Sequence, residues 1–177
     1  MQDNRNVIDK YKGMPLDTIV GDLDAHGVEL EIAVENLTRD FNMGTIIRSA
    51  NAFGVRHVHV IGSRQWNKRG AMMTDKYLHV HYYATIDEFM DTNSDKTIIA
   101  IDNVADSMNL SATSLPKSAI LVFGSEGNGL SEELLSKAKT IISIEQLGST
   151  RSLNVGVAAG VVMYEWLRQH ELDGTDK

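Results

Sequence analysis

The 177-residue chain contains no cysteine, which excludes disulfide bonds and thiolate metal sites and suits a reducing compartment. No apolar run reaches the length of a membrane-spanning helix, and the most apolar window, residues 155–163, is too short. No basic, apolar leader opens the chain. Because 42% of its residues are hydrophobic, the chain can bury one ordinary core, and we expect a soluble, cytoplasmic protein.

Positive charge is also scarce, and the net charge of −7 argues at first against a polyanionic partner. Its distribution is uneven, however. Residues 1–35 carry −5 and residues 77–177 carry −7, whereas residues 36–76 carry +5. A positive segment in an acidic chain is typical either of solvated surface or of a local phosphate contact, since charges act over about one Debye length.

The hydrophobic pattern predicts strands and helices in alternation. Strands are expected at residues 30–37, 57–61, 78–83, 96–101, 119–123 and 140–144. Helices are expected at residues 16–27, 45–53, 86–91 and 131–139, and from about Ser152 or Asn154 to Trp166. Residues 63–77, with one helical turn at 71–76, and residues 102–118 are expected to be mostly loop. The alternation indicates an α/β domain with a mainly parallel sheet flanked by helices.

Three loops hold the polar residues that could form a ligand site. In the first, residues 36–48, Asn42 can cap a helix whose first turns carry Arg48. The second, residues 123–130 (FGSEGNGL), follows a buried strand, and its glycines permit close backbone contact with a ligand. It has neither the lysine of a Walker loop nor the G-x-G-x-x-G spacing of dinucleotide folds. Taken singly, Arg48 could equally form a surface ion pair, and residues 123–130 an ordinary turn.

The third loop, residues 147–154 (LGSTRSLN), leads into a helix that is apolar nearly all round. Such a helix must be covered on more than one side. Gly156 and Gly160 lie four residues apart and leave one face flat enough for another backbone to approach. A polar loop that leads into this helix indicates a ligand site beside a packing or subunit interface.

In order and spacing, the three loops resemble the signature motifs of SpoU-type (TrmH-like) RNA methyltransferases of the SPOUT superfamily. The matching segments are NMGTIIRSANAFG, LVFGSEGNGLSEELL and ISIEQLGSTRSLNVGVAAGVVMYEW. The resemblance spans residues 30–168. It implies a SPOUT fold with a deep trefoil knot at the C-terminal end, S-adenosylmethionine as cofactor, and ribose 2′-O-methylation of tRNA or rRNA. We accordingly expect an acidic extension (1–28), a methyltransferase domain (29–169) and a short tail (170–177).

The same resemblance implies roles for individual residues. The catalytic set comprises Arg48, Asn42, Glu126, Ser152 and Asn154. The cofactor is expected at Gly124, Ser125, Glu126, Gly127, Ile144, Gln146, Leu147, Ser152, Leu153 and Asn154. RNA is expected to contact Arg39, Arg48, Arg64, Lys68, Arg69 and Arg151. A homodimer is expected to form through the C-terminal helix and the helix that bears Arg48, and neither a membrane nor a metal ion is an expected partner.

Arginine is a poor general base, because its pKa lies above about 12. We expect Arg48 to hold a neighbouring phosphate and to stabilise the developing alkoxide. The phosphate, Glu126 or water would then assist removal of the hydroxyl proton. An Arg48 that acts in its deprotonated form is the competing mechanism.

Several residues and functions have alternative interpretations. The pairs His57/His59 and His79/His81 could suggest a metal site, but no carboxylate lies at ligand spacing, so ordinary strand-surface histidines are favoured. Trp66 either stacks on an exposed base or covers the domain's own core, and Trp166 is expected in dimer or core packing. A non-catalytic RNA-binding module would need no cofactor. A nucleotide-binding oxidoreductase is disfavoured, because no G-x-G-x-x-G turn follows the first strand.

Overall fold

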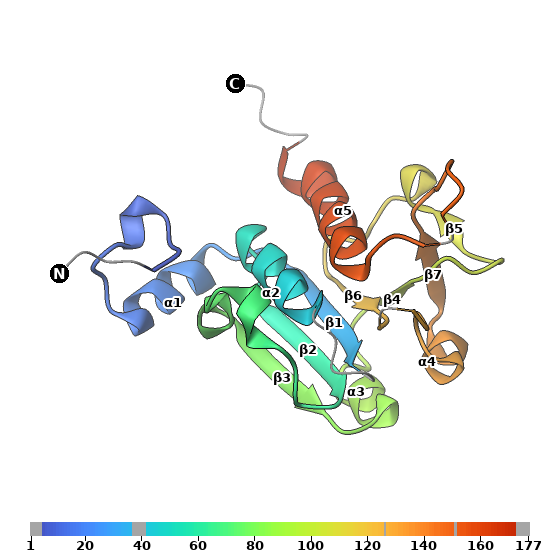
Figure 1. The fold of residues 1–177 in the computed structure, drawn as a ribbon, viewed down its shortest axis with the longest axis horizontal. Helices are drawn as coiled ribbons and strands as arrows, with labels where there is room; N and C mark the ends of the chain where they lie inside the picture. The colour runs from blue at the N-terminus through green and yellow to red at the C-terminus, as the bar shows by residue number, and fades with distance from the viewer. Residues whose placement is uncertain (1–4, 37–41, 126, 151, 173–177) are drawn as a thin grey trace.

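The computed structural model describes residues 5–36, 42–125, 127–150 and 152–172. Its strands form one sheet in the order β3-β2-β1-β6-β4-β7-β5, and every pair is parallel (Figure 1). The strands are β1 (Leu30–Asn36), β2 (His57–Gly62), β3 (His79–Tyr83), β4 (Ile98–Ile101), β5 (Met108–Asn109), β6 (Ala119–Phe123) and β7 (Thr140–Ser143). The parallel α/β architecture predicted from the sequence is confirmed.

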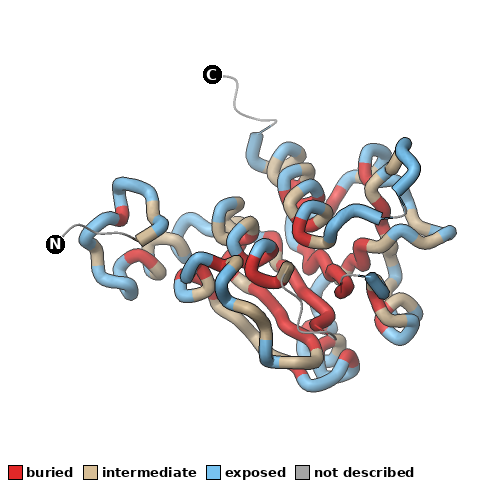
Figure 2. The backbone as a smooth tube through the Cα atoms, in the orientation of Figure 1, coloured by how far each residue is buried: buried red, intermediate tan, exposed pale blue. Residues whose placement is uncertain are grey.

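Helices cover both faces of this sheet. The helices α2 (Asn42–Ala52) and α5 (Val155–Leu167) share one core with alternate strand residues. The shorter helices α3 (Ile86–Thr92) and α4 (Glu132–Lys137) pack through Phe89 and Leu134 on the residues of the opposite face. All five residues of β6 are therefore buried, and Figure 2 shows the buried strands at the centre of the molecule. Burial on two sides explains why this strand is apolar throughout.

Three differences between the observed and the predicted elements are the largest. Strand β5 pairs Met108 with Ile142 in a segment expected to be loop, because two residues are too few to leave a periodic pattern. Helix α2 begins at Asn42, three residues before the predicted start. The basic connection contains two 3₁₀ turns, η2 (Lys68–Ala71) and η3 (Thr74–Tyr77), where one was expected. No helix in the described part of the chain is long and apolar enough to cross a membrane.

The N-terminal segment lies beside the β3 edge of the sheet (Figure 1). It consists of η1 (Asp9–Tyr11) and α1 (Leu16–Ala25). Ile19 of α1 is buried against Tyr77 of η3. Arg56, which is 5% exposed, donates from Nε to Asp24 Oδ1 over 2.8 Å and from its terminal nitrogen to the carbonyl of Tyr77 over 2.6 Å. One buried guanidinium thus joins α1, η3 and the start of β2.

The end of α5 is tied to the segment that precedes β6. This segment follows η4 (Leu110–Ala112), and α5 continues into the π-helical turn η5 (Arg168–Leu172). Trp166, 1% exposed, donates Nε1–H to the carbonyl of Pro116 over 3.0 Å. Gln169 Oε1 accepts the amide of Leu115 over 2.8 Å, and His170 Nε2 lies 2.8 Å from the carbonyl of the same residue. Trp166 therefore serves core packing, one of its two expected roles.

Candidate active site

The first and third loops meet through two asparagines. Asn154 caps α5, because its Oδ1 accepts the amides of Gly156 and Val157 over 3.0 and 3.3 Å. Its Nδ2 donates to Oδ1 of Asn42, the first residue of α2, over 2.9 Å. Asn154, rather than Ser152, is therefore the cap. The side chains that the sequence assigned to two separate motifs form one hydrogen-bonded pair.

Glycines allow the first turn of α2 to contact its neighbours closely. A Cβ added to Gly44 would lie 2.7 Å from the amide nitrogen of Ala71 and 2.8 Å from the Cα of Gly70. At the start of α5, a Cβ on Gly156 would lie 3.0 Å from Thr45 Cγ2. Helix α2 is thus held against both the basic turn η2 and the start of α5.

The second loop is a tight glycine turn that closes on itself. Ser125 and Gly129 exchange two backbone hydrogen bonds of 3.1 Å each. Gly127 and Gly129 adopt positive φ angles of 93° and 67°, which glycine accepts without a steric penalty. A Cβ on Gly124 would lie 2.1 Å from the backbone of Gly129. The turn therefore presents backbone to its surroundings, as expected for a site that recognises a ligand through main-chain groups.

A cavity of about 390 Å³ lies where the second and third loops face the ends of β4, β6 and β7. Most of the residues predicted to bind the cofactor line it: Gly124, Ser125, Gly127, Ile144, Gln146, Ser152, Leu153 and Asn154. The side chain of Leu147 is fully exposed and does not line the cavity. Glu126 lies outside the described residues. The volume suits a small organic ligand.

Two polar atoms in the cavity wall are buried without a hydrogen-bond partner among the described residues. They are Ser125 Oγ and Gln146 Oε1. Buried polar atoms are normally paired, because desolvation without a hydrogen bond costs about 1–3 kcal/mol. A ligand with its own donors and acceptors would satisfy both atoms, so the wall fits a polar cofactor.

The sequence interpretation missed two polar residues of the wall. Asp102 and Asn103 follow β4 directly and line the cavity. Asp102 Oδ2 accepts the amide of Leu130 over 2.7 Å, and its Oδ1 accepts the amide of Asn103 over 2.7 Å. Their position could have identified them, because ligand-binding residues in parallel sheets gather at the carboxyl ends of strands.

Arg48 lies on α2 one turn after Gly44, and its side chain is exposed. It forms no ion pair or hydrogen bond with the part of the chain that the structure describes, and it does not line the cavity. The guanidinium is therefore available to a partner from solution. Its catalytic role stays a prediction.

The predicted RNA-contacting residues lie mainly between β2 and β3. Asn36 Nδ2, at the end of β1, donates to the carbonyls of Ser63 and Gln65 over 2.6 and 3.2 Å and so fixes the start of this connection. Arg64 lies 5.6 Å from the ring of Tyr82. Lys68 and Arg69 are exposed on η2, close to the first turn of α2. Arg39 and Arg151 lie outside the described residues.

Trp66 belongs to this connection and packs against the main core. Its Nε1 is buried and has no hydrogen-bond partner in the described part of the chain, and Lys68 Nζ lies 5.4 Å from its ring. This placement favours the core-covering role over base stacking. The salt bridge of Lys68 with Asp75, 3.0 Å long, raises the pKa of the lysine.

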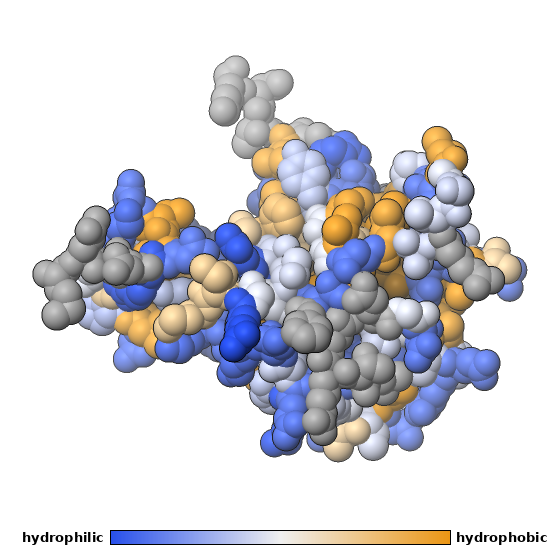
Figure 3. Space-filling model, viewed as in Figure 1, coloured by the Kyte–Doolittle hydropathy of each residue, from blue (hydrophilic) through white to orange (hydrophobic). Residues whose placement is uncertain are grey.

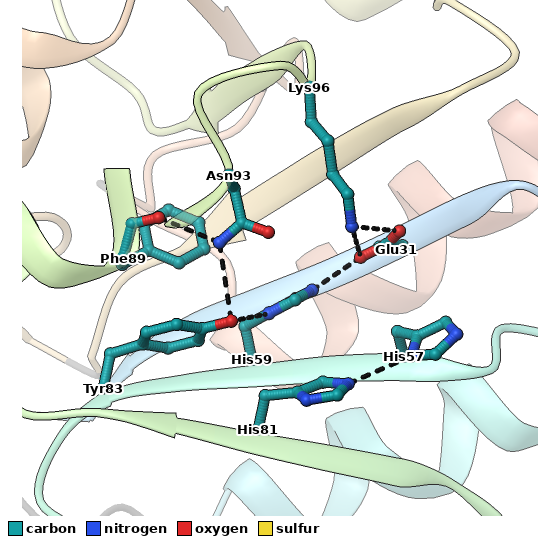
Figure 4. A network of polar contacts seen from close by, with 8 residues as sticks. All are labelled: Glu31, His57, His59, His81, Tyr83, Phe89, Asn93 and Lys96. Carbon is teal, nitrogen blue, oxygen red and sulfur yellow. Dashed lines mark hydrogen bonds and ion pairs between the residues drawn. The ribbon is translucent and has the colours of Figure 1, made fainter. Parts of the chain in front are cut away.

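The four histidines of β2 and β3 form a stacked ladder on one face of the sheet. Figure 4 shows three of them, His57, His59 and His81. The prediction of surface histidines is wrong for His59, which is 2% exposed because Phe89 and Tyr83 pack against it. His57 Nδ1 and His81 Nε2 lie 3.0 Å apart. The described residues contain no group of three or more side chains able to hold a metal ion.

Glu31 extends the histidine ladder onto β1. Its Oε2 lies 2.6 Å from His59 Nε2, and Lys96 Nζ donates to both of its oxygens over 2.7 and 2.8 Å (Figure 4). Burial opposes ionisation of Glu31, but these hydrogen bonds outweigh it and lower the pKa of the carboxyl to about 2. This pairing could not be predicted from the sequence, since Glu31, His59 and Lys96 come from three separate segments.

An apolar surface remains on the outer side of α5. Val157, Val161 and Tyr164 are 54%, 41% and 52% exposed. They line a groove of about 540 Å³ together with residues of η4 and with Ile144 and Glu145, which follow β7. Figure 3 shows apolar surface gathered over this helix. Exposed apolar patches of this kind commonly mark contact surfaces.

The SpoU rRNA Methylase family matches residues 29–164 of the chain. The chain belongs to this family. It is 28% identical over 151 residues to a tRNA (guanosine(18)-2′-O)-methyltransferase from Thermus thermophilus, an alignment that covers 80% of this chain and 75% of that protein. As a SpoU methylase, the chain is a methyltransferase, so the predicted enzyme class is confirmed.

Solved structures support the same assignment for this SpoU methylase. It matches the TrmH/SpoU tRNA modifying enzyme of A. aeolicus with a TM-score of 0.78 and 25% identity, over 90% of this chain and 84% of that chain. AviRb of Streptomyces viridochromogenes, solved in complex with the cofactor AdoMet (S-adenosylmethionine), matches with a TM-score of 0.69 and 25% identity, over 82% of this chain and 61% of that chain.

Proposed function

We propose that this SpoU methylase transfers the methyl group of S-adenosylmethionine to a ribose 2′-hydroxyl of tRNA. The observation that carries the proposal is the Asn42–Asn154 hydrogen bond, which couples the Arg48-bearing helix to the loop that lines the cavity. The choice of tRNA over rRNA rests on the names of the T. thermophilus and A. aeolicus relatives.

The cofactor supplies an electrophilic methyl group, and the chain supplies its position. The backbone of residues 124–129 and the side chains of Ser125 and Gln146 would hold the cofactor through the groups described above. Ser152 and Asn154 face the same cavity from the third loop. Fixing the acceptor oxygen in line with the methyl group accounts for much of the rate of such a transfer.

Arg48 would act from the RNA side of the site. Its exposed guanidinium can bind the phosphate beside the target ribose and stabilise the alkoxide as the oxygen loses its proton. Arg64, Lys68 and Arg69 would extend the contact along the RNA backbone. The proton would pass to the phosphate, Glu126 or water, whereas an Arg48 that acts as a base needs a deprotonated guanidine.

Transfer of tritiated methyl groups tests the reaction. The purified chain is incubated with labelled S-adenosylmethionine and either total tRNA or ribosomal RNA, and methylated positions are mapped by their resistance to alkali. Label at a ribose of tRNA is the expected result. Label in a base overturns the reaction, and label confined to ribosomal RNA overturns the substrate.

Variants of Arg48 separate the two mechanisms. Arg48→Ala should abolish transfer, whereas Arg48→Lys should keep partial activity, because lysine retains the charge that binds phosphate. Lys117→Ala removes an exposed charge paired with Glu29 and serves as the matched control. Rates for Arg48→Lys equal to those for Arg48→Ala across the pH range would contradict the electrostatic role.

The alternative that the sequence left open, a non-catalytic RNA-binding module, is disfavoured. It would not need a cavity with unpartnered polar atoms in its wall, and Ser125 and Gln146 therefore favour the enzyme. Calorimetry with S-adenosylmethionine distinguishes the two, because a binding module should show no heat of cofactor binding while it retains affinity for RNA.

A homodimer is part of the proposal, with contacts through α5 and α2. The support is the exposed apolar face of α5 and the contact of Phe53, next to α2, with Tyr164, whose ring centroids lie 6.2 Å apart. Light scattering should give twice the chain mass. Val161→Glu should yield monomers, and a wild-type monomer would contradict the proposed interface.

We further propose the deep trefoil knot and a cytoplasmic location, with residues 1–28 as an extension of a domain at 29–169 and residues 170–177 as a short tail. Support for the knot is the resemblance of the three motifs to SPOUT methyltransferases. Pulling the chain from its termini in an optical trap tests the knot. A tightened knot should leave the unfolded chain shorter than its full contour length, whereas full extension would exclude it.

A further inference from the structure

The cavity wall contains one formal charge among the residues that the structure describes. That charge belongs to Asp102, whereas the other described wall residues are glycines, apolar residues, or the neutral polar side chains of serine, asparagine and glutamine. Neither the family motifs nor the three predicted loops include this position. The carboxylate is therefore a feature of the site that the proposed mechanism does not yet use.

The fold fixes the Asp102 carboxylate firmly. Its own amide donates to the carbonyl of Ile142 on β7 over 3.1 Å. Its Oδ2 accepts the amide of Leu130 and lies 2.6 Å from the position that a Cβ of Gly129 would occupy. The glycine turn is thus built against this carboxylate, and the residue that follows the turn is hydrogen-bonded to it.

The size of the cavity brings any bound charge near Asp102. A space of about 390 Å³ would measure only about 9 Å across as a sphere, which is comparable to the Debye length of about 8 Å at physiological salt. A cationic centre in the cavity therefore lies within range of the carboxylate whichever way the ligand is oriented. The methyl donor carries a sulfonium, whereas the product, S-adenosylhomocysteine, carries a neutral thioether in its place.

We propose that Asp102 is a specificity residue that makes the cavity favour the charged cofactor over its neutral product. The carboxylate stabilises the sulfonium before transfer and loses this attraction once the methyl group has left. Product then dissociates more readily than cofactor. This inference rests on the proposed function, because it assumes that S-adenosylmethionine occupies the cavity.

Calorimetry with three ligands tests the proposal. Asp102→Asn removes the charge and one of the two acceptor oxygens: it keeps an oxygen for the Leu130 amide, whereas the Asn103 amide loses its acceptor. The substitution should lower the affinity for S-adenosylmethionine by about fivefold, as expected for one partly screened charge pair. It should lower the affinity for sinefungin, which has a cationic amine in place of the sulfonium, by a similar factor. Affinity for S-adenosylhomocysteine should weaken less than affinity for either of the other two ligands, because all three share the charges of the amino-acid moiety and only this one lacks the additional positive charge.

Asp106→Asn is the matched control, since Asp106 is exposed and does not line the cavity. If Asp102→Asn lowers the affinity for all three ligands equally, the residue only supports the glycine turn. If it lowers none of the affinities, the charge of Asp102 is irrelevant to binding. Either result overturns the inference. A wild-type chain that binds none of the ligands instead refutes the proposed function.

A measurement on the wild-type chain covers the case in which Asp102→Asn does not fold. The preference for S-adenosylmethionine over S-adenosylhomocysteine should decrease as salt is added, because salt screens the charge pair. A preference that does not change with salt contradicts the proposal.

Discussion

Asn42 and Asn154 are separated by 112 positions in the sequence, yet the Nδ2 of Asn154 donates to the Oδ1 of Asn42 over 2.9 Å. The Oδ1 of the same Asn154 side chain caps α5. One amide group therefore performs two tasks with its two ends: the oxygen begins a helix, and the nitrogen connects the two motifs.

Asn154→Asp should separate these tasks. Aspartate caps a helix as well as asparagine does, so the free energy of unfolding should stay within about 0.5 kcal/mol of the wild type. The donor to Asn42 is lost, and the rate of methyl transfer should fall about tenfold or more, because the motifs are no longer aligned. Single-turnover assays and urea denaturation measure the two effects.

Asn154→Ala is the companion variant, because it removes both the cap and the donor. It should lose about 1 kcal/mol of stability in addition to activity. If Asn154→Asp transfers methyl groups at the wild-type rate, the hydrogen bond to Asn42 has no catalytic importance.

Gly44→Ala tests the close contact between α2 and the basic turn η2. The added methyl group meets the backbone of Gly70 and Ala71 at 2.7 to 2.9 Å, and backbone cannot move aside as a flexible side chain can. We expect a loss of about 1–3 kcal/mol in the free energy of unfolding, typical of overpacking. RNA affinity should fall as well, because η2 carries Lys68 and Arg69.

Gly21→Ala is the control for this experiment. Gly21 lies inside α1, and a Cβ there has no neighbour within 4 Å. The substitution should stabilise the chain by about 0.5–1 kcal/mol, since alanine favours a helix interior. If Gly44→Ala and Gly21→Ala change the free energy of unfolding in urea by the same amount, the contact at Gly44 is not tight.

Glu31 should contribute a pH-dependent part of the stability. Because hydrogen bonds from His59 and Lys96 overcome the effect of burial, its pKa falls from the ordinary 4.5 to about 2 in the folded chain. The unfolded chain therefore binds the proton first on acidification. The contribution is complete above pH 4.5 and is lost as the pH falls toward about 2.

Glu31→Gln should therefore flatten the dependence of the unfolding free energy on pH between those two values. Urea titrations at a series of pH values measure it. Glu29→Gln, which removes an exposed carboxyl paired with Lys117, is the matched control. A slope in Glu31→Gln identical to that of the wild type would contradict the assigned hydrogen bonds.

His57 and His81 should also make the stability depend on pH, in a range above that of Glu31. Burial is the main cause that lowers the pKa of both rings below 6.5, and neighbouring histidines add to it. Since the unfolded chain takes up these protons first, stability should be complete above pH 6.5 and should decline as the pH falls below it. NMR titration should show two imidazoles with midpoints below 6.5.

The sheet was largely predictable because its main strands are apolar runs. Ala119–Phe123 is buried on both faces, and its composition alone indicates this. The two residues of β5 could not be found in the same way, because their pairing with β7 depends on where the chain returns in space. The sequence also does not show which histidine is covered: His59 is buried because of the position of Phe89 on α3.

The cavity was predictable in part. Its glycine turn and the third loop each follow a strand and precede a helix. Both loops were identified from the sequence by their resemblance to the SpoU signature motifs. Asp102 was missed because its contact with Leu130 joins the ends of two strands that are adjacent in the sheet but not in the chain. The side chain of Leu147, in contrast, lies outside the cavity although its neighbour Gln146 contributes to the wall.

The ties at both ends of α5 have a consequence for biosynthesis. Its first residues contact α2, and Trp166 and Gln169 bond to residues 113–116, all made much earlier on the ribosome. The wall that this helix contributes cannot exist until the polypeptide has been translated past these positions. Nascent chains and fragments that end before them should therefore be unable to capture the methyl donor.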